Sequence, residues 1–400
     1  MKLQVQTITI FLCFCIGFQV RAESATEDFI KKAGHAVEKH EVTTEDGYII
    51  TLHRIKSPLR APVLLVHPMG TSGVIWVVPF QPNAKPIAIS IFESSYDIWI
   101  LHHRGTKESL GHLTIDPSVH YYWNFTLHEL ALFDVRNSID YIFEKTERPL
   151  NYVGVSQGAS LLMMLLATKP EYNRKIFGAY LIAPFYECNV SPSIQTGYSK
   201  FLKKIQENFL NPLTYNIVWD IGNPYLYQEM EPILKSKSEV DRFMQETALL
   251  VGKFNPDLDY TSILNLTLNV IGDCVGMNTV KHLNQIIQSH KFARFDYGEE
   301  ENKRIYGQKT PPEYDLSPIK IATAICAFES DVLSNMKDCE KLSTKFPKSR
   351  YVHFAGNQLD FWATQKSVDA ILHDFDLFEQ NLIVLQYSAS VYTSFKMKSK

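Results

Sequence analysis

The sequence predicts an α/β protein with a mostly parallel central sheet, helices on both of its faces and a large, mostly helical insertion. Apolar strand segments alternate with helical segments over most of the chain, which is the pattern of a parallel sheet covered by helices. Within this alternation, the pentapeptide Gly154-Val155-Ser156-Gln157-Gly158 joins a strand to a helix. Between residues 191 and 317 the alternation stops, so we expect an insertion there.

The composition fits one sizeable globular core. Of the residues, 45% are hydrophobic and 21% are charged, and the net charge is −3. This balance gives no electrostatic case for nucleic acid, so we expect no nucleic-acid partner. We find no internal repeat and no low-complexity segment, so any second module is an insertion within one fold.

The first 22 residues have the features of a secretory signal peptide. Lys2 precedes an apolar run at 8–18, and Val20-Arg21-Ala22 provides a small-residue exit. A buried strand or a membrane anchor is the alternative. The run is shorter than the ~20 apolar residues of a spanning helix, and no other stretch approaches that length. We therefore expect an exported chain, secreted or alternatively lysosomal, without a transmembrane anchor.

Glycosylation sequons and cysteines also bear on whether the chain is exported. Three acceptor sequons for N-glycosylation begin at Asn124, Asn189 and Asn265. Two of the six cysteines leave with the signal peptide, and Cys188, Cys274, Cys326 and Cys339 remain. Four cysteines permit three pairings, and in a chain of this size they can also be buried thiols. The sequence does not choose among these possibilities.

The expected strands and helices can be placed in order. Two short strands lie within residues 41–54, around the turn at 45–47. Further strands are expected at 63–66, 97–101, 150–153, 179–182, 319–327 and 351–354. Helices are expected near 127–143 and at 160–167. This order gives one sheet with crossover helices.

The insertion is rich in Phe, Tyr, Leu and Ile and has helical patterns near 199–208, 238–251 and 280–290. At the top of the sheet it would form a cap over the serine, and its apolar character suits an apolar substrate. An extra packing layer is the alternative. The expected organisation is a signal peptide at 1–22, a core formed by 23–190 and 318–379, a cap or lid at 191–317 and a tail at 380–400.

The pentapeptide around Ser156 fits a nucleophile elbow. In such an elbow a strand turns sharply into a helix and lifts one serine hydroxyl above the sheet, and small flanking residues permit the turn. The pattern G-x-S-x-G alone is weak, because a chain of this length matches it by chance about one time in ten. The buried strand before it and the buried helix after it supply the context that the motif requires. A chance turn serine is the alternative.

Ordered motifs over most of the mature chain, from residue 41 to about 379, carry a resemblance to a known family. They are Thr44-Glu45-Asp46-Gly47-Tyr48, Leu52-His53-Arg54-Ile55, Leu64-Leu65-Val66-His67, Tyr96-Asp97-Ile98-Trp99, Arg104-Gly105, Trp123-Asn124-Phe125, His128-Glu129, the elbow, Ala183-Pro184, the segment 292–298, Asn302, Tyr306-Gly307, Pro311-Pro312-Glu313-Tyr314 and Asn357-Gln358-Leu359-Asp360-Phe361. The chain resembles the acid lipase family of α/β hydrolases, the gastric and lysosomal lipase type. The resemblance implies the α/β-hydrolase fold and an ester hydrolase without a cofactor or metal. It also implies a neutral lipid or fatty-acyl ligand, such as an acylglycerol or sterol ester, at a lipid–water interface.

Ester hydrolysis of this kind needs a nucleophile, a base, an acid that orients the base and donors for the oxyanion. The resemblance assigns Ser156 as the nucleophile and the backbone N–H groups of Gln157 and Met69 as the oxyanion donors. Pro68 stands where the family has a glycine, but the expected donor belongs to Met69. His67 lies in the oxyanion turn and is not expected to be the base.

The orienting acid maps to Asp331, with a surface-loop aspartate as the alternative. The base is where the sequence departs from the family. The family loop has His at the position of Gln358, and glutamine cannot accept a proton near neutral pH. His353 in the last strand and His373 on the next helix are not good substitutes. We therefore expect feeble ester hydrolysis, if any.

Two functional classes follow. One is an acid-lipase-like ester hydrolase of low activity, or one with a base recruited from elsewhere. The other is a non-catalytic lipid-binding or carrier protein with the same pocket. Ser156, Gln157 and Asp331 favour the first class, and Gln358 favours the second. A peptidase of the same fold is a weaker possibility, and the sequence leaves the oligomeric state open.

Overall fold

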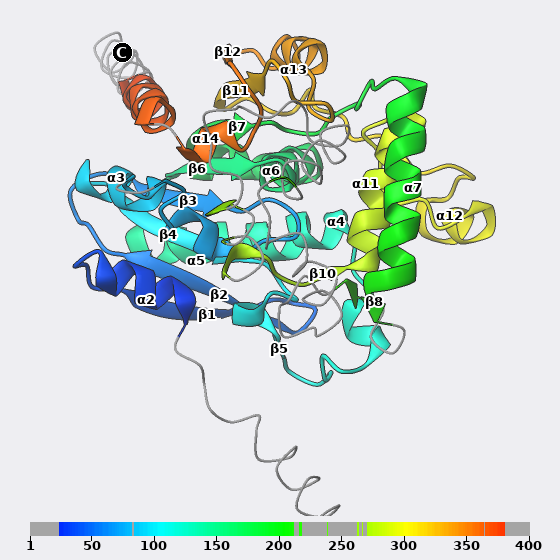
Figure 1. Cartoon of the computed structure of the whole chain (residues 1–400), viewed down its shortest axis with the longest axis horizontal. Helices are drawn as coiled ribbons and strands as arrows, with labels where there is room; N and C mark the ends of the chain where they lie inside the picture. The colour runs from blue at the N-terminus through cyan, green and yellow to red at the C-terminus, as the bar shows by residue number, and fades with distance from the viewer. Residues whose placement is uncertain are drawn as a thin grey trace, which may run out of the picture.

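A computed structural model describes residues 24–81, 84–211, 216–217, 238, 262–263, 266, 270–363 and 365–380. The expected signal peptide, the sequon at Asn265, most of the helical pattern at 238–251 and most of the tail lie outside the described residues. The described part is built around one large twisted sheet, with helices on both of its faces (Figure 1).

The large sheet has the strand order β1-β2-β4-β3-β6-β7-β11-β12, and β5 pairs with β2. Its strands are β1 (Glu38–Thr43), β2 (Tyr48–Ile55), β3 (Pro62–Val66), β4 (Asp97–His102), β5 (Gly111–His112), β6 (Leu150–Val155), β7 (Ile176–Ile182), β11 (Ala322–Phe328) and β12 (Ser349–Phe354). The pairings β1–β2 and β2–β4 are antiparallel, and all pairings from β4 to β12 are parallel. The mostly parallel sheet predicted from the sequence is confirmed.

Alternate residues of the central strands point to opposite faces of the sheet. In β3, Leu64 and Val66 belong to one buried apolar cluster, and Val63 and Leu65 belong to the other. The first cluster is completed by α5 (Arg136–Thr146), α6 (Gln157–Thr168) and α13 (Met336–Ser343), and the second by α2 (Ala25–Lys32), α3 (Ile87–Glu93) and the helical residues 365–380. Both faces of a parallel sheet are therefore covered, which explains why its strands are almost wholly apolar.

The insertion contributes two long helices that lie side by side at one end of the sheet (Figure 1). They are α7 (Pro192–Phe209) and α11 (Met277–Ser289). Gln195 on α7 donates from Nε2 to the Ile287 carbonyl oxygen of α11 at 3.0 Å. The insertion also forms a small sheet of β8 (Leu210–Asn211), β9 (Asn216–Ile217) and β10 (Val275–Gly276), and a further helix, α12 (Glu299–Tyr306).

Two local differences from the sequence-based prediction have simple causes. The helix expected near 127–143 contains a π-helical stretch, Leu130–Val135, between α4 (Leu127–Glu129) and α5. The strand expected from 319 begins only at Ala322, because a turn at 317–318 holds Ile319, which is buried without joining the sheet. The apolar character of Ile319 correctly predicted that it is buried, but it did not predict that β11 begins three residues later, at Ala322.

Candidate active site

Ser156 lies at a sharp turn between β6 and α6. Its backbone has φ 51° and ψ −110°, a conformation that non-glycine residues seldom adopt. The Ser156 N–H donates to the Ile182 carbonyl oxygen of β7 at 2.7 Å, which holds the turn at the carboxyl edge of the sheet. The side chain is half-buried. The predicted strand–turn–helix arrangement is therefore present.

The two glycines of the pentapeptide are required by close packing. A Cβ added to Gly154 would lie 2.5 Å from the carbonyl carbon of Gly158, and one added to Gly158 would overlap the backbone oxygen of Val66. Because both obstacles are backbone atoms, neither can move aside cheaply. The small residues thus let helix α6 start directly above β6 and against β3.

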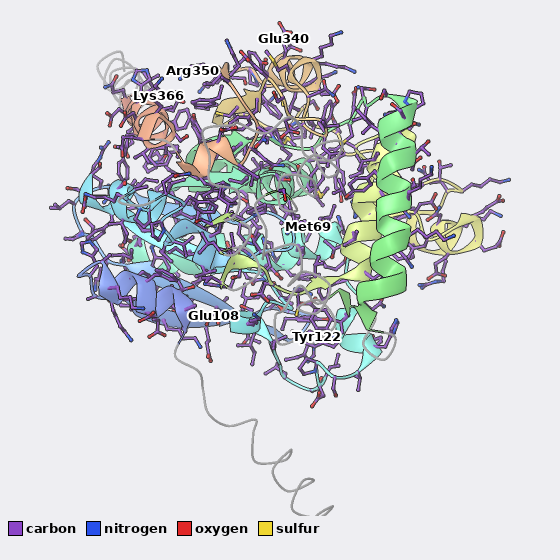
Figure 2. All side chains as sticks on the ribbon, in the orientation of Figure 1. Met69, Glu108, Tyr122, Glu340, Arg350 and Lys366 are labelled. Carbon is purple, nitrogen blue, oxygen red and sulfur yellow. The ribbon has the colours of Figure 1, made fainter. Side chains whose placement is uncertain are left out.

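The two expected oxyanion donors lie at turns where their N–H groups have no structural partner. Gln157 is the first residue of α6, so its N–H has no acceptor within the helix. Neither Gln157 N nor Met69 N donates to another backbone group within the described residues. Gly70, with φ 75°, ends the turn after Met69, which is labelled near the middle of Figure 2.

His67 has a structural role in this turn. Its Nδ1 lies 2.9 Å from the Pro68 carbonyl oxygen, and its Nε2 accepts a hydrogen bond from the His103 N–H at 3.2 Å. These partners assign the proton to Nδ1 and occupy the lone pair of Nε2. Burial lowers the pKa of His67 well below its usual value. His67 therefore stays neutral, and its basic nitrogen is already in use.

Asp331 lies just beyond β11 and is buried. Its Oδ1 accepts hydrogen bonds from the N–H groups of Leu333 at 3.0 Å and Ser334 at 2.9 Å. Its Oδ2 is also buried and has no hydrogen-bond partner in the described part of the chain. Burial raises the pKa of this carboxyl to about 6. An orienting acid would use such a free oxygen to accept an imidazole N–H.

Gln358 lies in a rigid loop next to the loop of Asp331. The Glu329 N–H donates to the Phe354 carbonyl oxygen at 3.0 Å, which brings the two loops together. Asn357 N donates to Asp360 Oδ2 at 2.7 Å, and Asp360 N donates to the Asn357 carbonyl oxygen at 3.0 Å. These reciprocal bonds fix the loop on both sides of residue 358. No described residue hydrogen-bonds the Gln358 side chain or the Ser156 hydroxyl.

The two other histidines considered from the sequence are on the surface. His353 lies on β12, as predicted, and its side chain is exposed. His373 lies on the helical stretch 365–380 and is also exposed. Neither histidine hydrogen-bonds Ser156 or Asp331, so neither of them takes the place of the family base.

The sequence did not point to Asp273, which connects the end of the insertion to the turn that contains Met69 and Gly70. The Asp273 N–H donates to the Gly70 carbonyl oxygen at 3.0 Å, and Asp273 Oδ1 accepts from Lys107 N at 2.9 Å. Burial raises the pKa of Asp273 to about 6. The available signal was an acidic residue that closely follows the apolar pair Val270-Ile271.

The remaining candidate residues have mixed surroundings. Asn124 and Asn189 are both exposed, but the Asn189 amide donates to Glu187 at 3.0 Å and Asp338 at 2.7 Å. Cys188, Cys274, Cys326 and Cys339 are all free, and all of them except Cys274 are buried. The sequence left open disulfide bonds or thiols for these cysteines, and the structure has thiols.

No metal-binding group of three or more His, Cys, Asp or Glu residues occurs among the described residues.

Comparison with known proteins gives consistent results. The model of the partial alpha/beta-hydrolase lipase region matches residues 26–79. Lipase 1 of Drosophila melanogaster is 29% identical over 85% of this chain and 76% of its own length. Gastric triacylglycerol lipase of Rattus norvegicus is 27% identical over 82% of this chain and 85% of its own length.

Solved structures agree on the fold. A putative lipase from Acinetobacter baumannii superposes with a TM-score of 0.53 at 12% identity, over 91% of this chain and 99% of that chain. At that identity the likeness concerns the fold alone. With the strand order and the strained turn at Ser156, it defines the α/β-hydrolase fold.

The sequence comparisons indicate a more specific family within the α/β-hydrolase fold. The matched lipase region and the similarity to gastric lipases over most of the chain support membership of the acid lipase family. Within the described residues, no helix is long and apolar enough to cross a membrane.

Proposed function

We propose that the chain is a carboxylic ester hydrolase that acts on neutral lipids, acylglycerols or sterol esters, through Ser156. The strained turn at Ser156 carries this proposal. A serine held at φ 51° costs free energy, of order 1–3 kcal/mol, which a purely structural turn would avoid by using glycine. The strain is expected where a hydroxyl must project above a sheet toward a substrate.

The surroundings of Ser156 support the same chemistry. The N–H groups of Gln157 and Met69 have no backbone acceptor in the described structure, so they are available to stabilise a tetrahedral oxyanion. Asp331 retains a buried oxygen without a partner, which suits the acid of a triad. A protein that only bound lipid would have no chemical need of this set of groups.

The activity is proposed to be low because Gln358 stands at the position of the base. Without a proton acceptor, the serine hydroxyl remains a weak nucleophile, since its own pKa is far above neutral. In subtilisin, used here as the yardstick, loss of the histidine costs about 10⁶ in turnover, and ~10³ to 10⁴ over water remains from binding and the oxyanion hole. Hydrolysis by the present chain is expected to be of that residual kind.

Gln358 also favours a second candidate function, a non-catalytic lipid-binding or carrier protein on the same fold. Both candidates share the ligand, a neutral lipid or fatty-acyl chain. We further propose secretion, or alternatively delivery to lysosomes, with the insertion acting as the cap at 191–317.

Release of fatty acid from an emulsified triacylglycerol separates the two functions. The wild type and Ser156→Ala are compared at equal concentration, with long incubation. Slow release by the wild type that Ser156→Ala abolishes supports the hydrolase. Equal release by both proteins contradicts it. In that case a thermal shift of both proteins with long-chain fatty acids would support the carrier function, and no shift would contradict both.

A further inference from the structure

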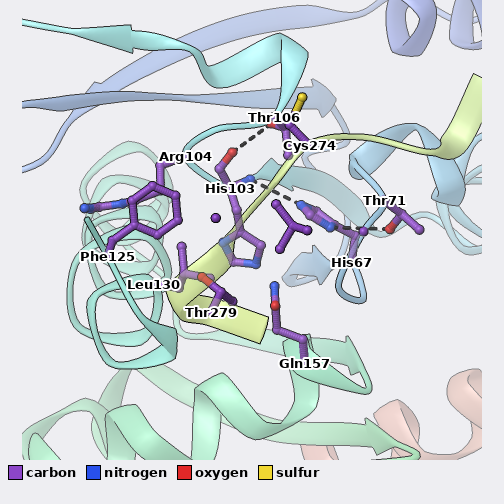
Figure 3. A pocket seen from close by; sticks show the side chains of 13 residues that line it. His67, Thr71, His103, Arg104, Thr106, Phe125, Leu130, Gln157, Cys274 and Thr279 are labelled. Carbon is purple, nitrogen blue, oxygen red and sulfur yellow. Dashed lines mark hydrogen bonds between the residues drawn. The ribbon is translucent and has the colours of Figure 1, made fainter. Parts of the chain in front are cut away.

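A small cavity lies beside the turn that contains His67 and Gly70, and several of the side chains that line it are polar. Its volume is about 20 Å³, and its lining includes His103, Gln157 and Thr279 (Figure 3). His103 follows β4, Gln157 begins α6, and Thr279 lies in the first turn of α11. The three residues therefore come from the core on two sides and from the insertion on the third.

Each of the three side chains has a buried polar atom without a partner. The atoms are His103 Nε2, Gln157 Oε1 and Thr279 Oγ1, and none has a hydrogen bond to any described residue. The side chains themselves are at most 3% exposed. A buried polar atom that lacks a hydrogen bond costs about 1–3 kcal/mol. A shared partner for the three atoms would remove this cost from all of them at once.

The chemical type of each atom can be assigned. His103 Nδ1 makes no hydrogen bond in the described structure, but it lies 3.5 Å from Asp134 Oδ2, and a carboxylate near this nitrogen favours the tautomer with the proton on Nδ1. His103 Nε2 is then an acceptor. Gln157 Oε1 is an acceptor as well, and the Thr279 hydroxyl can donate. The cavity thus presents two acceptors and one donor.

We propose that the cavity is a binding site for one water molecule, held by His103, Gln157 and Thr279. The water donates one hydrogen to His103 Nε2 and one to Gln157 Oε1, and it accepts the hydrogen of Thr279 Oγ1. Buried waters make about three hydrogen bonds, and a cavity needs roughly 10–15 Å³ to hold one. Both the count of partners and the volume of about 20 Å³ fit a single water.

The proposed water joins three structural parts, the residues after β4, the start of α6 and the first turn of α11. His67, Gly70 and Thr71 of the oxyanion turn line the same cavity. The water links the side chain of Gln157 to the insertion through α11 and to the core through His103. It therefore positions the start of α6, whatever the rate of hydrolysis, and it does not depend on the proposed function.

Thr279→Val tests the site, because the direction of the change in Tm depends on whether the water is present. Valine has nearly the shape of threonine but no hydroxyl, so it removes a hydrogen bond without opening a cavity. If the water is present, it loses one partner, and we expect the Tm of the full chain to fall by about 1–3 °C. If the cavity is dry, the change removes an unsatisfied hydroxyl, and the Tm rises or stays the same.

Thr323→Val is the matched control. Thr323 on β11 is buried and its hydroxyl also lacks a partner among the described residues, but it does not line this cavity. We expect no fall in Tm for this variant. A crystal structure of the wild type should show one density peak within about 3.2 Å of the three polar atoms, and that peak should weaken in Thr279→Val. An empty cavity in the density, or a Thr279→Val protein at least as stable as the wild type, overturns the proposal.

Discussion

The Ser330 N–H donates to the carbonyl oxygen of Gly356 at 2.8 Å, so the loop that carries Asp331 is hydrogen-bonded to the loop that carries Gln358. Gly356 has φ 82°, and a Cβ at this position would overlap the Asp360 carboxylate. The loop geometry around residue 358 is therefore specified although the residue itself makes no hydrogen bond within the described structure. A histidine placed there would be delivered by an intact loop next to an acid with a free oxygen.

Gln358→His should raise esterase activity on short-chain p-nitrophenyl esters by several orders of magnitude. The imidazole would supply the missing base, and Asp331 Oδ2 would hold its tautomer. The gain is bounded by the ~10⁶ that loss of such a histidine costs in subtilisin. Pro68 limits it further if the turn misplaces the Met69 N–H, since one oxyanion donor is worth roughly 10² to 10³. The measurement is kcat/KM for both proteins.

The control for this gain is Gln358→His combined with Ser156→Ala, which should return activity to the background. A wild type that already matches Gln358→His would show that the base is not missing. If Gln358→His is inactive, Pro68→Gly is added to it. Continued inactivity would then contradict the inference that only the base has been lost.

Fluorophosphonate probes should label Ser156 slowly or not at all in the wild type. Phosphonylation requires the same activated hydroxyl as acyl transfer, and no described residue accepts its proton. Labelling of intact protein, followed by mass spectrometry, measures the rate, and Gln358→His should label much faster. Rapid stoichiometric labelling of the wild type at Ser156 would reveal a base that the described residues do not include.

The sequence was sufficient to predict the sheet, its main strands and the strained serine. Burial on both faces of the sheet requires apolar strands, and this requirement is visible in the residue types. Close approach of two backbone segments requires glycine, which explains the two glycines of the pentapeptide. The position of Asp331 beyond a strand end could be predicted for the same reason, because the carboxyl ends of parallel strands meet at one edge.

The contacts between distant segments could not be predicted. The bond from Asp273 to Gly70 and the orphan atoms of His103, Gln157 and Thr279 depend on how the insertion returns to the core. The hydrophobic periodicity of the sequence does not predict where the end of the insertion contacts the core. The sequence also did not show whether the Gln358 amide would reach Oδ2 of Asp331, because that depends on side-chain geometry that a motif does not specify.

Gly158→Ala should prevent correct folding or lower stability severely. The added methyl group would overlap the Val66 backbone oxygen, so either helix α6 or strand β3 must move. Gly197 on α7 is the matched control, since a Cβ there meets nothing within 4 Å. Gly197→Ala should stabilise by about 0.5–1 kcal/mol through helix propensity. Soluble yield and urea unfolding measure both, and equal effects of the two variants would contradict the packing argument.

Asp331→Asn should stabilise the protein near neutral pH but not in acid. Burial raises the pKa of Asp331 to about 6 from an ordinary 3.8, so the folded state binds this proton more tightly than the unfolded state does. Stability therefore falls as the pH rises from about 4 to about 6, and the full penalty persists above that range. Two pKa units correspond to about 3 kcal/mol, which is the upper bound for the gain at pH 7. Asparagine keeps an oxygen for the Leu333 and Ser334 N–H groups.

The pH dependence distinguishes this cause from a change in packing. Urea unfolding of the wild type and Asp331→Asn at about pH 4 and about pH 7 should give curves that coincide in acid and separate at neutral pH. Gln358→His offers an independent check, because an imidazole N–H on Asp331 Oδ2 favours the carboxylate and lowers its pKa. In the Gln358→His background, Asp331→Asn should then lose its advantage at pH 7. A gain that is the same at both pH values would show that the buried charge is not its source.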